Sequence, residues 1–314
     1  MKKVLAACLS AFLFPACMIS AATVLNPECR RQLIDDDWQF RLTVNDRGEK
    51  LESGWTDVDL PHDWSVLHDF DAEASTGNDG GYLPAGRGVY RKVIDVPAGA
   101  LHGRHTAIRL DGAYMDAEVA VNGHVVGKRP YGYSPATYDI TPYLHAGENE
   151  ITVDVDNSAQ KNSRWYSGSG IYRHVWLLNT GDVAVRPESV FITTPQVSED
   201  ASTVNLELAV ENRSPRGGDI TVKATILDTD GRKVDAVSAN VAVPADSAAA
   251  AQLRFAPKLL ALWSPDAPAL YEMQVELLEG DKVVDTFTQT FGVRSIAYSL
   301  SLIHISEPTR RRGI

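Results

Sequence analysis

Cysteine is scarce in this chain of 314 residues, which excludes a fold held together by disulfides. It has three cysteines, and only Cys29 follows residue 22, so no intrachain disulfide is expected in the mature chain. Positive charge is also in short supply, with 30 Lys and Arg against 41 Asp and Glu and a net charge of −11. Nucleic acid or an anionic membrane would be repelled by such a chain, whereas a neutral ligand would not.

No apolar run is long and continuous enough for a transmembrane helix. The most apolar stretch, Val4–Ile19, is short and interrupted, and it stands between Lys2-Lys3 and the small residues Ser20-Ala21-Ala22. This order predicts a signal peptide over residues 1–22 and export to the periplasm or the medium. Phe-Pro-Ala before Cys17 loosely resembles a lipobox, so a lipoprotein anchored at Cys17 is the alternative, and processing by signal peptidase I or II stays open.

Residues 23–181 show the short alternating strands and turn-rich punctuation of an all-β sandwich. Ala117–Val121, Asn122-Gly123 and His124–Gly127 predict a hairpin, because Asn-Gly accepts the two positive φ angles of its turn. Further strands are expected at Val58–Trp64, where a proline ends the strand, and at Ile171–Leu177. Residues 69–88 are crowded with Asp, Gly and Asn and predict a long loop.

Residues 182–299 predict a second sandwich of immunoglobulin-like size. Three runs alternate inward, and the alanine-rich stretch 248–251 between strand-like runs is interpreted as a strand. The inward residues are Val204, Leu206, Leu208 and Val210, then Ile220, Val222, Ala224 and Ile226, then Tyr271, Met273, Val275 and Leu277. Residues 300–314 break this pattern, and the block Arg310–Arg312 contrasts with an acidic chain. They are interpreted as a tail foreign to the protein, with a native, disordered basic tail as the alternative.

The loop between the Ile151 strand and Ile171 carries the groups that suit a sugar. Asp156 and Asn157 offer hydrogen-bond partners for hydroxyls, and Trp165 offers a flat ring for an apolar sugar face. Loops at one end of a β-sandwich commonly display binding groups on a rigid scaffold. The alternative is structural: Asp156 ends a strand with an Asx turn, and the aromatic residues pack against a neighbouring domain.

The loop Asn162–Arg173 resembles a signature of glycoside hydrolase family 2. Between its two end residues its sequence is Ser-Arg-Trp-Tyr-Ser-Gly-Ser-Gly-Ile-Tyr. Matching pieces occur in the family's order: Leu60–Trp64, Gly88–Arg91, Asp111–Gly123, Arg129–Tyr133, Leu262–Asp266, Leu270-Tyr271 and Phe291–Arg294. The amino-acid sequence of this loop, Asn162–Arg173, is most similar to that of the β-galactosidase branch of the family. The resemblance implies an all-β arrangement, with a jelly-roll (galactose-binding-like) domain over 23–181 and an immunoglobulin-like domain over 182–299.

In that family a (β/α)8 barrel follows and cleaves the glycoside with retention, using two glutamates. The barrel should begin after Tyr298, and the remaining residues are too few for the roughly 250 that a barrel needs. The catalytic (β/α)8 barrel is therefore expected to be absent and this chain inactive alone, with no catalytic residue in it. Asn149-Glu150 superficially matches the family's Asn-Glu acid/base, but it is expected to be a turn entering the Ile151 strand.

The resemblance also implies site residues. Counting back from Ile171, the family's sugar-contacting aspartate falls on Asp156, with Asn157 beside it, while Arg164 and Trp165 would shape the rim of the site or dock on the barrel. Arg91 and Arg173 are expected in structural ion pairs. No cofactor or metal site is expected in this chain, although a divalent cation in the full-length enzyme is possible.

The expected partners are a β-galactoside or oligosaccharide substrate and the missing C-terminal barrel, with no nucleic acid and no membrane span; a homo-oligomer is open. Three alternatives remain. One is a free-standing carbohydrate-binding module, the second a family member of other specificity (β-glucuronidase or β-mannosidase), and the third an unstable fragment with an exposed apolar surface.

Overall fold

The computed structural model describes residues 23–296 except 187, 199–201 and 259. The expected signal peptide with Cys17 and the tail 300–314 lie outside the described residues. Within the described part the chain is built from β-strands, with three short 3-10 helices, η1 (Ser65–Leu67), η2 (Gly77–Gly80) and η3 (Thr141–Tyr143). No helix in this part is long and apolar enough to cross a membrane.

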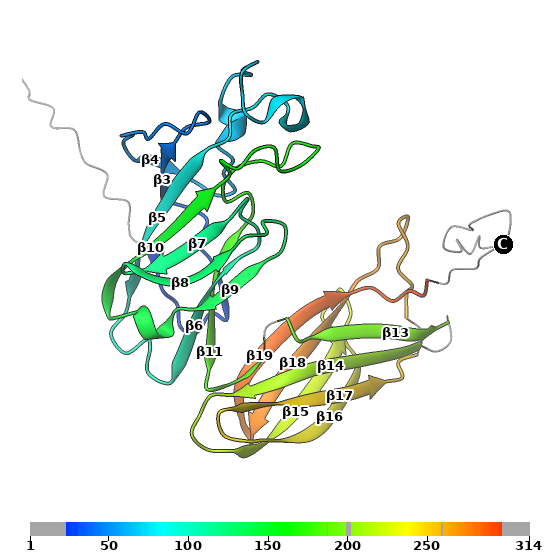
Figure 1. Ribbon diagram of the computed structural model, residues 1–314. Helices are drawn as coiled ribbons and strands as arrows, with labels where there is room; N and C mark the ends of the chain where they lie inside the picture. The colour runs from blue at the N-terminus through cyan, green and yellow to red at the C-terminus, as the bar shows by residue number, and fades with distance from the viewer. Residues whose placement is uncertain (1–22, 187, 199–201, 259, 297–314) are drawn as a thin grey trace, which may run out of the picture. The chain divides into compact units, whose positions relative to one another are not determined.

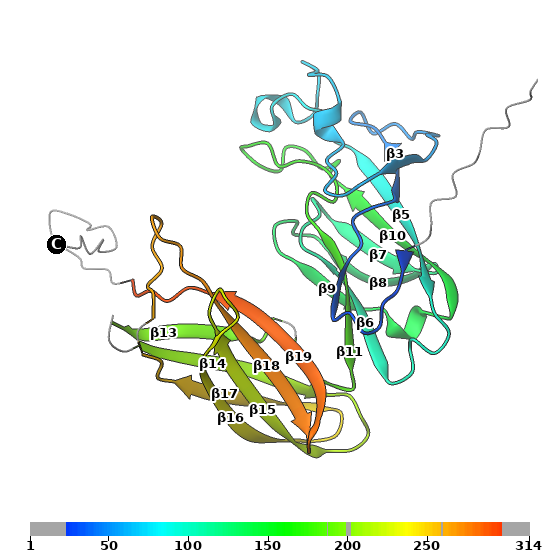
Figure 2. The same cartoon turned by 180° about the vertical axis from the view of Figure 1, so that it is seen from behind.

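The described chain forms two compact units (Figures 1 and 2). The first unit comprises residues 23–26, 32–100 and 108–177. The second comprises 27–31, 101–107 and 178–296.

The larger sheet of the jelly roll has the strand order β4-β3-β5-β10-β7-β8, with β1 paired in parallel to β5. A second sheet has the order β2-β11-β6-β9. The strands of the first sheet are β1 (Thr23–Val24), β3 (Trp38–Val44), β4 (Thr56–Val58), β5 (Arg87–Val96), β7 (Ala117–Val121), β8 (His124–Arg129) and β10 (Gly147–Asp156). Those of the second are β2 (Arg31–Leu33), β6 (Arg104–Leu110), β9 (Ala136–Asp139) and β11 (Val175–Gly181).

Alternation of burial along the strands explains why the two sheets pack face to face. In β10 the side chains of Ile151, Val153 and Val155 are fully buried between the sheets, and the polar residues between them face outward. The predicted hairpin is confirmed as β7–β8, with φ of 50° at Asn122 and 78° at Gly123. The jelly-roll prediction is therefore confirmed.

Three local predictions are wrong. The predicted strand Val58–Trp64 ends at Val58, because the N–H groups of the residues beyond it are directed to loop carbonyls instead of a strand partner. The predicted strand from Ile171 begins only at Val175, since the Ile171 carbonyl accepts the N–H of His62. Asn149 and Glu150 are not a turn; both lie inside β10, paired with Ile94 and Val93.

The part of the second unit from Val183 onward is an immunoglobulin-like sandwich of two four-stranded sheets, as predicted. One contains β12 (Val183–Val185), β13 (Phe191–Val197), β14 (Ser202–Asn212) and β17 (Ser247–Phe255). The other has the order β16-β15-β18-β19, formed by β15 (Gly218–Leu227), β16 (Lys233–Val243), β18 (Tyr271–Glu279) and β19 (Lys282–Phe291). The three inward runs predicted from the sequence all lie in its core, and the alanine-rich stretch is part of β17, as expected.

Candidate functional site

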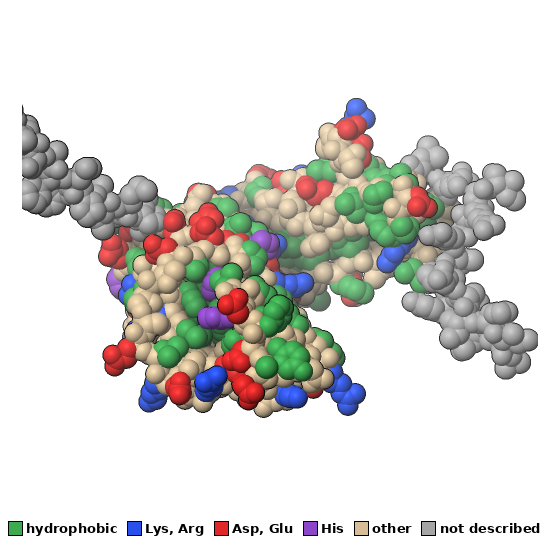
Figure 3. All heavy atoms as spheres, turned by 90° about the horizontal axis from the view of Figure 1, so that it is seen from above, with side chains coloured by type: hydrophobic (Ala, Val, Ile, Leu, Met, Phe, Trp, Pro, Cys, Tyr) green, Lys and Arg blue, Asp and Glu red, His purple; other side chains and the backbone are tan. Residues whose placement is uncertain are grey.

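The candidate site lies at the end of the jelly roll where β10 finishes and several loops meet. Loops 59–86, 111–116 and 157–174 are tied together there by backbone hydrogen bonds. Asp156 donates its N–H to the Met115 carbonyl at 2.9 Å, and Asn157 donates to Gly86 at 2.9 Å. Figure 3 looks down on this loop end, where hydrophobic, acidic and histidine side chains lie next to one another at the surface. A fixed set of loops can hold side chains in one geometry for a ligand.

Asp156 is the last residue of β10 and is partly exposed. Its Oδ1 accepts the N–H of Ser158 at 2.9 Å and the Ser158 hydroxyl at 2.6 Å, which is the Asx turn considered as an alternative. Only this one carboxylate oxygen is used within the described residues. The turn therefore holds the carboxylate still and leaves Oδ2 as an acceptor for a ligand.

Asn157 points the other way and is buried, with 2% of its surface exposed. Its Nδ2 donates to the Gly168 carbonyl at 3.0 Å and to the Ser169 hydroxyl at 2.8 Å. Its Oδ1 accepts from Gln160 at 2.9 Å and from Asn162 at 2.8 Å. Because both ends of the amide are used inside the loop, Asn157 organises the loop, and its contact with substrate stays a prediction.

Arg164 and Trp165 are exposed on the loop end. Arg164 forms no ion pair or hydrogen bond with the described part of the chain, so its charge is open to a ligand or partner. Trp165 is 60% exposed and donates its Nε1–H to the Tyr133 hydroxyl at 3.2 Å. Tyr133 in turn lies 5.0 Å from Tyr114 and 5.6 Å from Tyr131, centroid to centroid, so the loop end carries a group of contiguous aromatic rings.

Asp63 is a residue of the site that the sequence did not single out. Its carboxylate accepts the N–H of Ser65 at 3.0 Å, the N–H of Ser169 at 2.9 Å and the Tyr166 hydroxyl at 2.6 Å. It thereby connects loop 59–86 to loop 157–174. Desolvation, followed by the hydrogen bond to Asp63, raises the pKa of Tyr166 well above its usual range, so Tyr166 remains a hydrogen-bond donor at neutral pH.

A cluster of four packed rings, Phe40, His62, Trp64 and Tyr90, supports the same loops from the interior of the sandwich. Buried His62 lies with its Nδ1 2.8 Å from the Tyr90 hydroxyl, and Phe40 packs against His62, Trp64 and Tyr90. Burial lowers the pKa of His62 despite the nearby charge of Asp63. His62 is therefore a neutral structural residue at neutral pH.

A polar cleft of about 260 Å³, counted to its open mouth, lies between loops 59–86 and 157–174. Its lining is mostly hydroxyl and amide groups, from Ser65, Thr76, Asn157, Gln160, Ser163, Tyr166, Ser167 and Ser169. Many of these groups bond to one another, as in the 2.7 Å bond from Ser65 to Ser169. The cleft shares Asn157 with the loop that displays Asp156, so the polar network and the candidate ligand group belong to one structure.

One of the two ion pairs expected for arginine, that of Arg91, lies on the outward face of β5 and β10. Arg91 lies 3.8 Å from Glu150, which confirms the ion pair expected for Arg91 and places Glu150 on a sheet face. Arg173 is exposed and forms no ion pair with a described residue, so that expectation is wrong. Across the described ranges, no group of three His, Cys, Asp or Glu side chains is arranged to hold a metal ion.

The jelly roll displays a carboxylate, a guanidinium and aromatic rings at its loop end, a set of groups that suits the hydroxyls and the apolar face of a carbohydrate. Comparison with known proteins agrees with this chemistry. Residues 80–181 match the model of the glycosyl hydrolases family 2 sugar binding domain, and residues 185–294 match the model of glycosyl hydrolases family 2. The chain belongs to glycosyl hydrolase family 2 and corresponds to the N-terminal part of its members.

The relatives of this chain differ in the specificity that their names give, and they include both beta-galactosidases and beta-glucuronidases. The chain is 36% identical over 282 residues to beta-galactosidase BoGH2A of Bacteroides ovatus, covering 88% of this chain and 33% of that protein. It is 28% identical over 301 residues to a beta-glucuronidase of Bacteroides fragilis, covering 91% of this chain and 40% of that protein. A solved family 2 structure from Bacteroides cellulosilyticus superimposes with a TM-score of 0.79 at 33% identity, over 86% of this chain and 36% of that one. The chain thus spans about a third of the length of such relatives.

Proposed function

We propose that this chain is the non-catalytic N-terminal part of an exported glycosidase that hydrolyses β-galactosides with retention. The observation that carries the proposal is the fixed carboxylate of Asp156 at the loop end of a family 2 sugar-binding domain. The Asx turn to Ser158 orients one oxygen and leaves the other for a sugar hydroxyl. The described residues contain no (β/α)8 barrel, so the cleaving glutamates are assigned to another part of the protein.

The chemistry at Asp156 favours a neutral sugar over a uronic acid. A carboxylate accepts hydrogen bonds from hydroxyls, whereas it repels the carboxylate of a glucuronide. Trp165 adds an exposed ring on which the C–H face of a galactose residue can lie, and Arg164 adds donors at the rim. β-Glucuronidase specificity is the alternative, and it would need Arg164 to outweigh Asp156.

The first test is a turnover assay of the chain with a chromogenic β-galactoside. We expect no turnover. Hydrolysis by this chain alone would refute the assignment of a non-catalytic part. The second test is an NMR titration with galactose, in which the signals of the Trp165 indole N–H and the Ser158 amide are monitored.

Asp156→Asn is a selective variant for that titration, because the asparagine Oδ1 can still accept the hydrogen bonds from Ser158. The substitution removes the negative charge and replaces the free Oδ2 acceptor with an NH2 donor. We expect the galactose-dependent shifts to be lost in Asp156→Asn and kept in Asp69→Asn, an exposed aspartate without a described partner. Equal shifts in both variants, or stronger shifts with glucuronate than with galactose, would contradict the proposed site.

A free-standing carbohydrate-binding module is the second candidate, favoured by the exposed aromatic rings of Trp165 and Tyr131. It predicts that the isolated chain binds an oligosaccharide tightly by itself. The main proposal predicts weak binding, because the isolated chain offers only one wall of the site. A glycan array on the isolated chain separates the two.

A further inference from the structure

Three aromatic side chains are exposed next to one another at the loop end of the jelly roll. Tyr131 is 61% exposed, Trp165 60% and Tyr133 38%. Tyr133 contacts both of the others, because its hydroxyl accepts the Trp165 indole N–H at 3.2 Å and its ring lies 5.6 Å from the Tyr131 ring, centroid to centroid. The three rings therefore form one continuous surface, which we call the aromatic platform.

Gly132, which lies between Tyr131 and Tyr133 in the chain, is held by the loops around it. Its carbonyl accepts the Tyr172 hydroxyl at 2.9 Å. Its backbone approaches the neighbouring loop so closely that a Cβ on Gly132 would lie 2.7 Å from the Ala113 carbonyl oxygen. The position has no room for a side chain, and the glycine allows the two tyrosines to be anchored tightly to the rest of the jelly roll.

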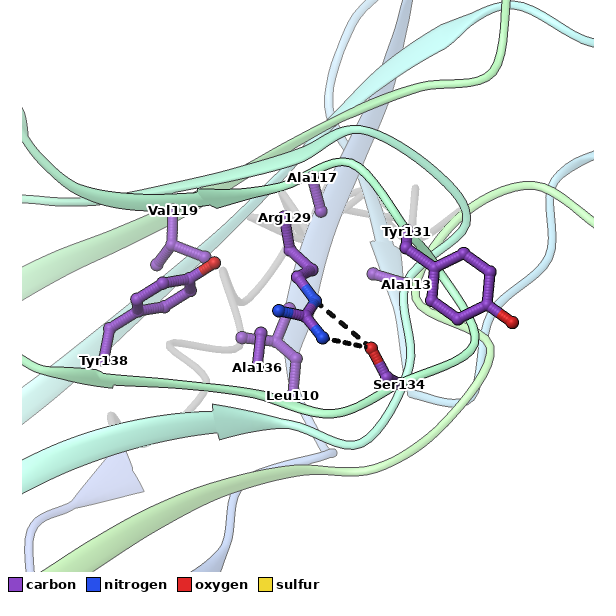
Figure 4. A pocket seen from close by; sticks show the side chains of 9 residues that line it. All are labelled: Leu110, Ala113, Ala117, Val119, Arg129, Tyr131, Ser134, Ala136 and Tyr138. Atoms are coloured by element: carbon purple, nitrogen blue, oxygen red, sulfur yellow. Dashed lines mark hydrogen bonds between the residues drawn. The ribbon is translucent and has the colours of Figure 1, made fainter.

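A second tie joins the ends of the segment that carries the two tyrosines. Arg129 donates to the Ser134 hydroxyl oxygen from Nε at 3.2 Å and from Nη2 at 2.5 Å, and the ring of Tyr131 points away from Arg129 (Figure 4). The pocket drawn there has room for about one water molecule, so a sugar can contact this segment only through its exposed rings. Because the backbone is already fixed, little further ordering is needed when a ligand binds.

The chemistry of the platform matches a pyranose ring. Each exposed ring offers a flat apolar face, on which the C–H face of a sugar can lie. The Tyr131 hydroxyl forms no hydrogen bond with a described residue, so it can donate to and accept from the hydroxyls of a sugar.

The platform adjoins the turn that holds Asp156. Asp156 donates its N–H to the Met115 carbonyl at 2.9 Å, and the ring of Tyr114, the preceding residue, lies 5.0 Å from that of Tyr133. Trp165 belongs to both places, since it is the ring proposed to carry the galactose and its indole is held by Tyr133. A ligand that extends from Asp156 across Trp165 therefore meets the rest of the platform.

We propose that the aromatic platform binds a second sugar unit, so that the substrate is a β-galactosyl saccharide and not the galactoside of a small alcohol. The galactose unit contacts Asp156 and Trp165. The sugar linked to it lies with its C–H face on Tyr131, within reach of the Tyr131 hydroxyl. This inference rests on the proposed function, because the site for the first sugar defines where the second one lies.

Two ligands that share the galactosyl unit test the platform. In lactose a glucose follows the β-linkage, and in methyl β-galactoside a methyl group does; both are titrated into the full chain and followed by 1H–15N NMR. We expect both to shift the Ser158 amide and the Trp165 indole N–H, and lactose alone to shift the amides of Tyr131 and Gly132. Lactose should bind about three- to tenfold more tightly, since stacking on one more aromatic ring contributes a gain of that order.

Variants of Tyr131 test the stacking directly. We expect Tyr131→Ala to bring the ratio of the two affinities close to one, and Tyr131→Phe, which keeps the ring, to retain most of the preference for lactose. Phe191→Ala is the matched control, because it removes a ring that is 60% exposed on β13, and it should leave the ratio as it is in the parent chain.

The second sugar and the proposed function fail in different ways. If both ligands shift the Ser158 amide but bind equally, or if Tyr131→Ala keeps the preference for lactose, the second sugar is overturned and the proposed function stands. The platform would then be a contact surface for another part of the protein. If neither ligand shifts Ser158 or Trp165, the proposed function is wrong and the second sugar fails with it.

Discussion

Asp63 gives the most demanding test of how the loop end is held. Its carboxylate connects loop 59–86 to loop 157–174 through the N–H of Ser169 and the hydroxyl of Tyr166, and it also accepts the N–H of Ser65. In Asp63→Ala the Ser169 N–H loses its acceptor at a residue that is 1% exposed. A buried unsatisfied donor costs about 1–3 kcal/mol, and the two other bonds, which water can partly replace, contribute less. The expected total is about 2–4 kcal/mol of unfolding free energy.

Tryptophan fluorescence is a suitable probe, because five of the six tryptophans, all except Trp263, lie in the first unit. We expect the urea midpoint of that signal to fall in Asp63→Ala. Asp63→Asn should lose only about 1 kcal/mol, since its Oδ1 can still accept both backbone N–H groups. Asp69→Ala is the control, and we expect it to stay within about 0.5 kcal/mol of the parent chain. If Asp63→Ala unfolded at the same urea concentration as this control, the carboxylate would not be what joins the loops.

Three other predictions follow from the same region. The pKa of His62 is lowered by burial, so its contribution to stability is present above pH 6.5 and is lost as the pH falls toward its folded pKa; we expect a pH titration of the urea midpoint to be flatter there in His62→Gln than in a control His102→Gln. Gly170→Ala would place a Cβ 2.2 Å from the Tyr90 hydroxyl at a residue with φ of 117°, so we expect a loss of about 3 kcal/mol or failure to fold, against a negligible loss in Gly54→Ala, where a Cβ meets nothing. Asn149→Ala removes a buried amide that bonds His145, Gly147 and Asn122, and should cost about 2–4 kcal/mol by urea denaturation, whereas its exposed neighbour in Glu150→Gln should cost little.

The strands were predictable because burial on a sheet alternates with a period of two, which is a property of neighbouring residues. Ile151, Val153 and Val155 show that period in the sequence, and all three are fully buried. The Asn-Gly hairpin was predictable for the same reason, since its two positive φ angles depend on those two residues. Val58–Trp64 failed as a strand because its composition suits a strand but its backbone partners lie elsewhere: His62 and Trp64 donate to Ile171 and Ser169.

The supports of the site were less accessible to sequence reasoning. Asp63 and Tyr166 are 103 residues apart, and no local pattern connects them. Asn157 was different, because a signal was available. Continuing the inward alternation of Ile151, Val153 and Val155 by one step places Asn157 inward, whereas chemical suitability for sugar binding suggested that it faces a ligand.

The same alternation explains why two adjacent polar residues at the end of β10 have different roles, one facing outward toward a ligand and the other holding the loop. Asp156 faces outward and keeps one carboxylate oxygen open, while Asn157 faces inward and spends its amide on Gly168, Ser169, Gln160 and Asn162. Loss of the inward residue should therefore disturb both the fold and the proposed sugar contact, whereas loss of the outward charge should affect the contact alone. A site built in this way can change its ligand group at one position without dismantling the loop, because the network that holds the loop is directed into the sandwich. Side chains at the outward positions 156, 164 and 165 are then the ones free to vary with the sugar, while Asp63 and Asn157 are constrained by their partners.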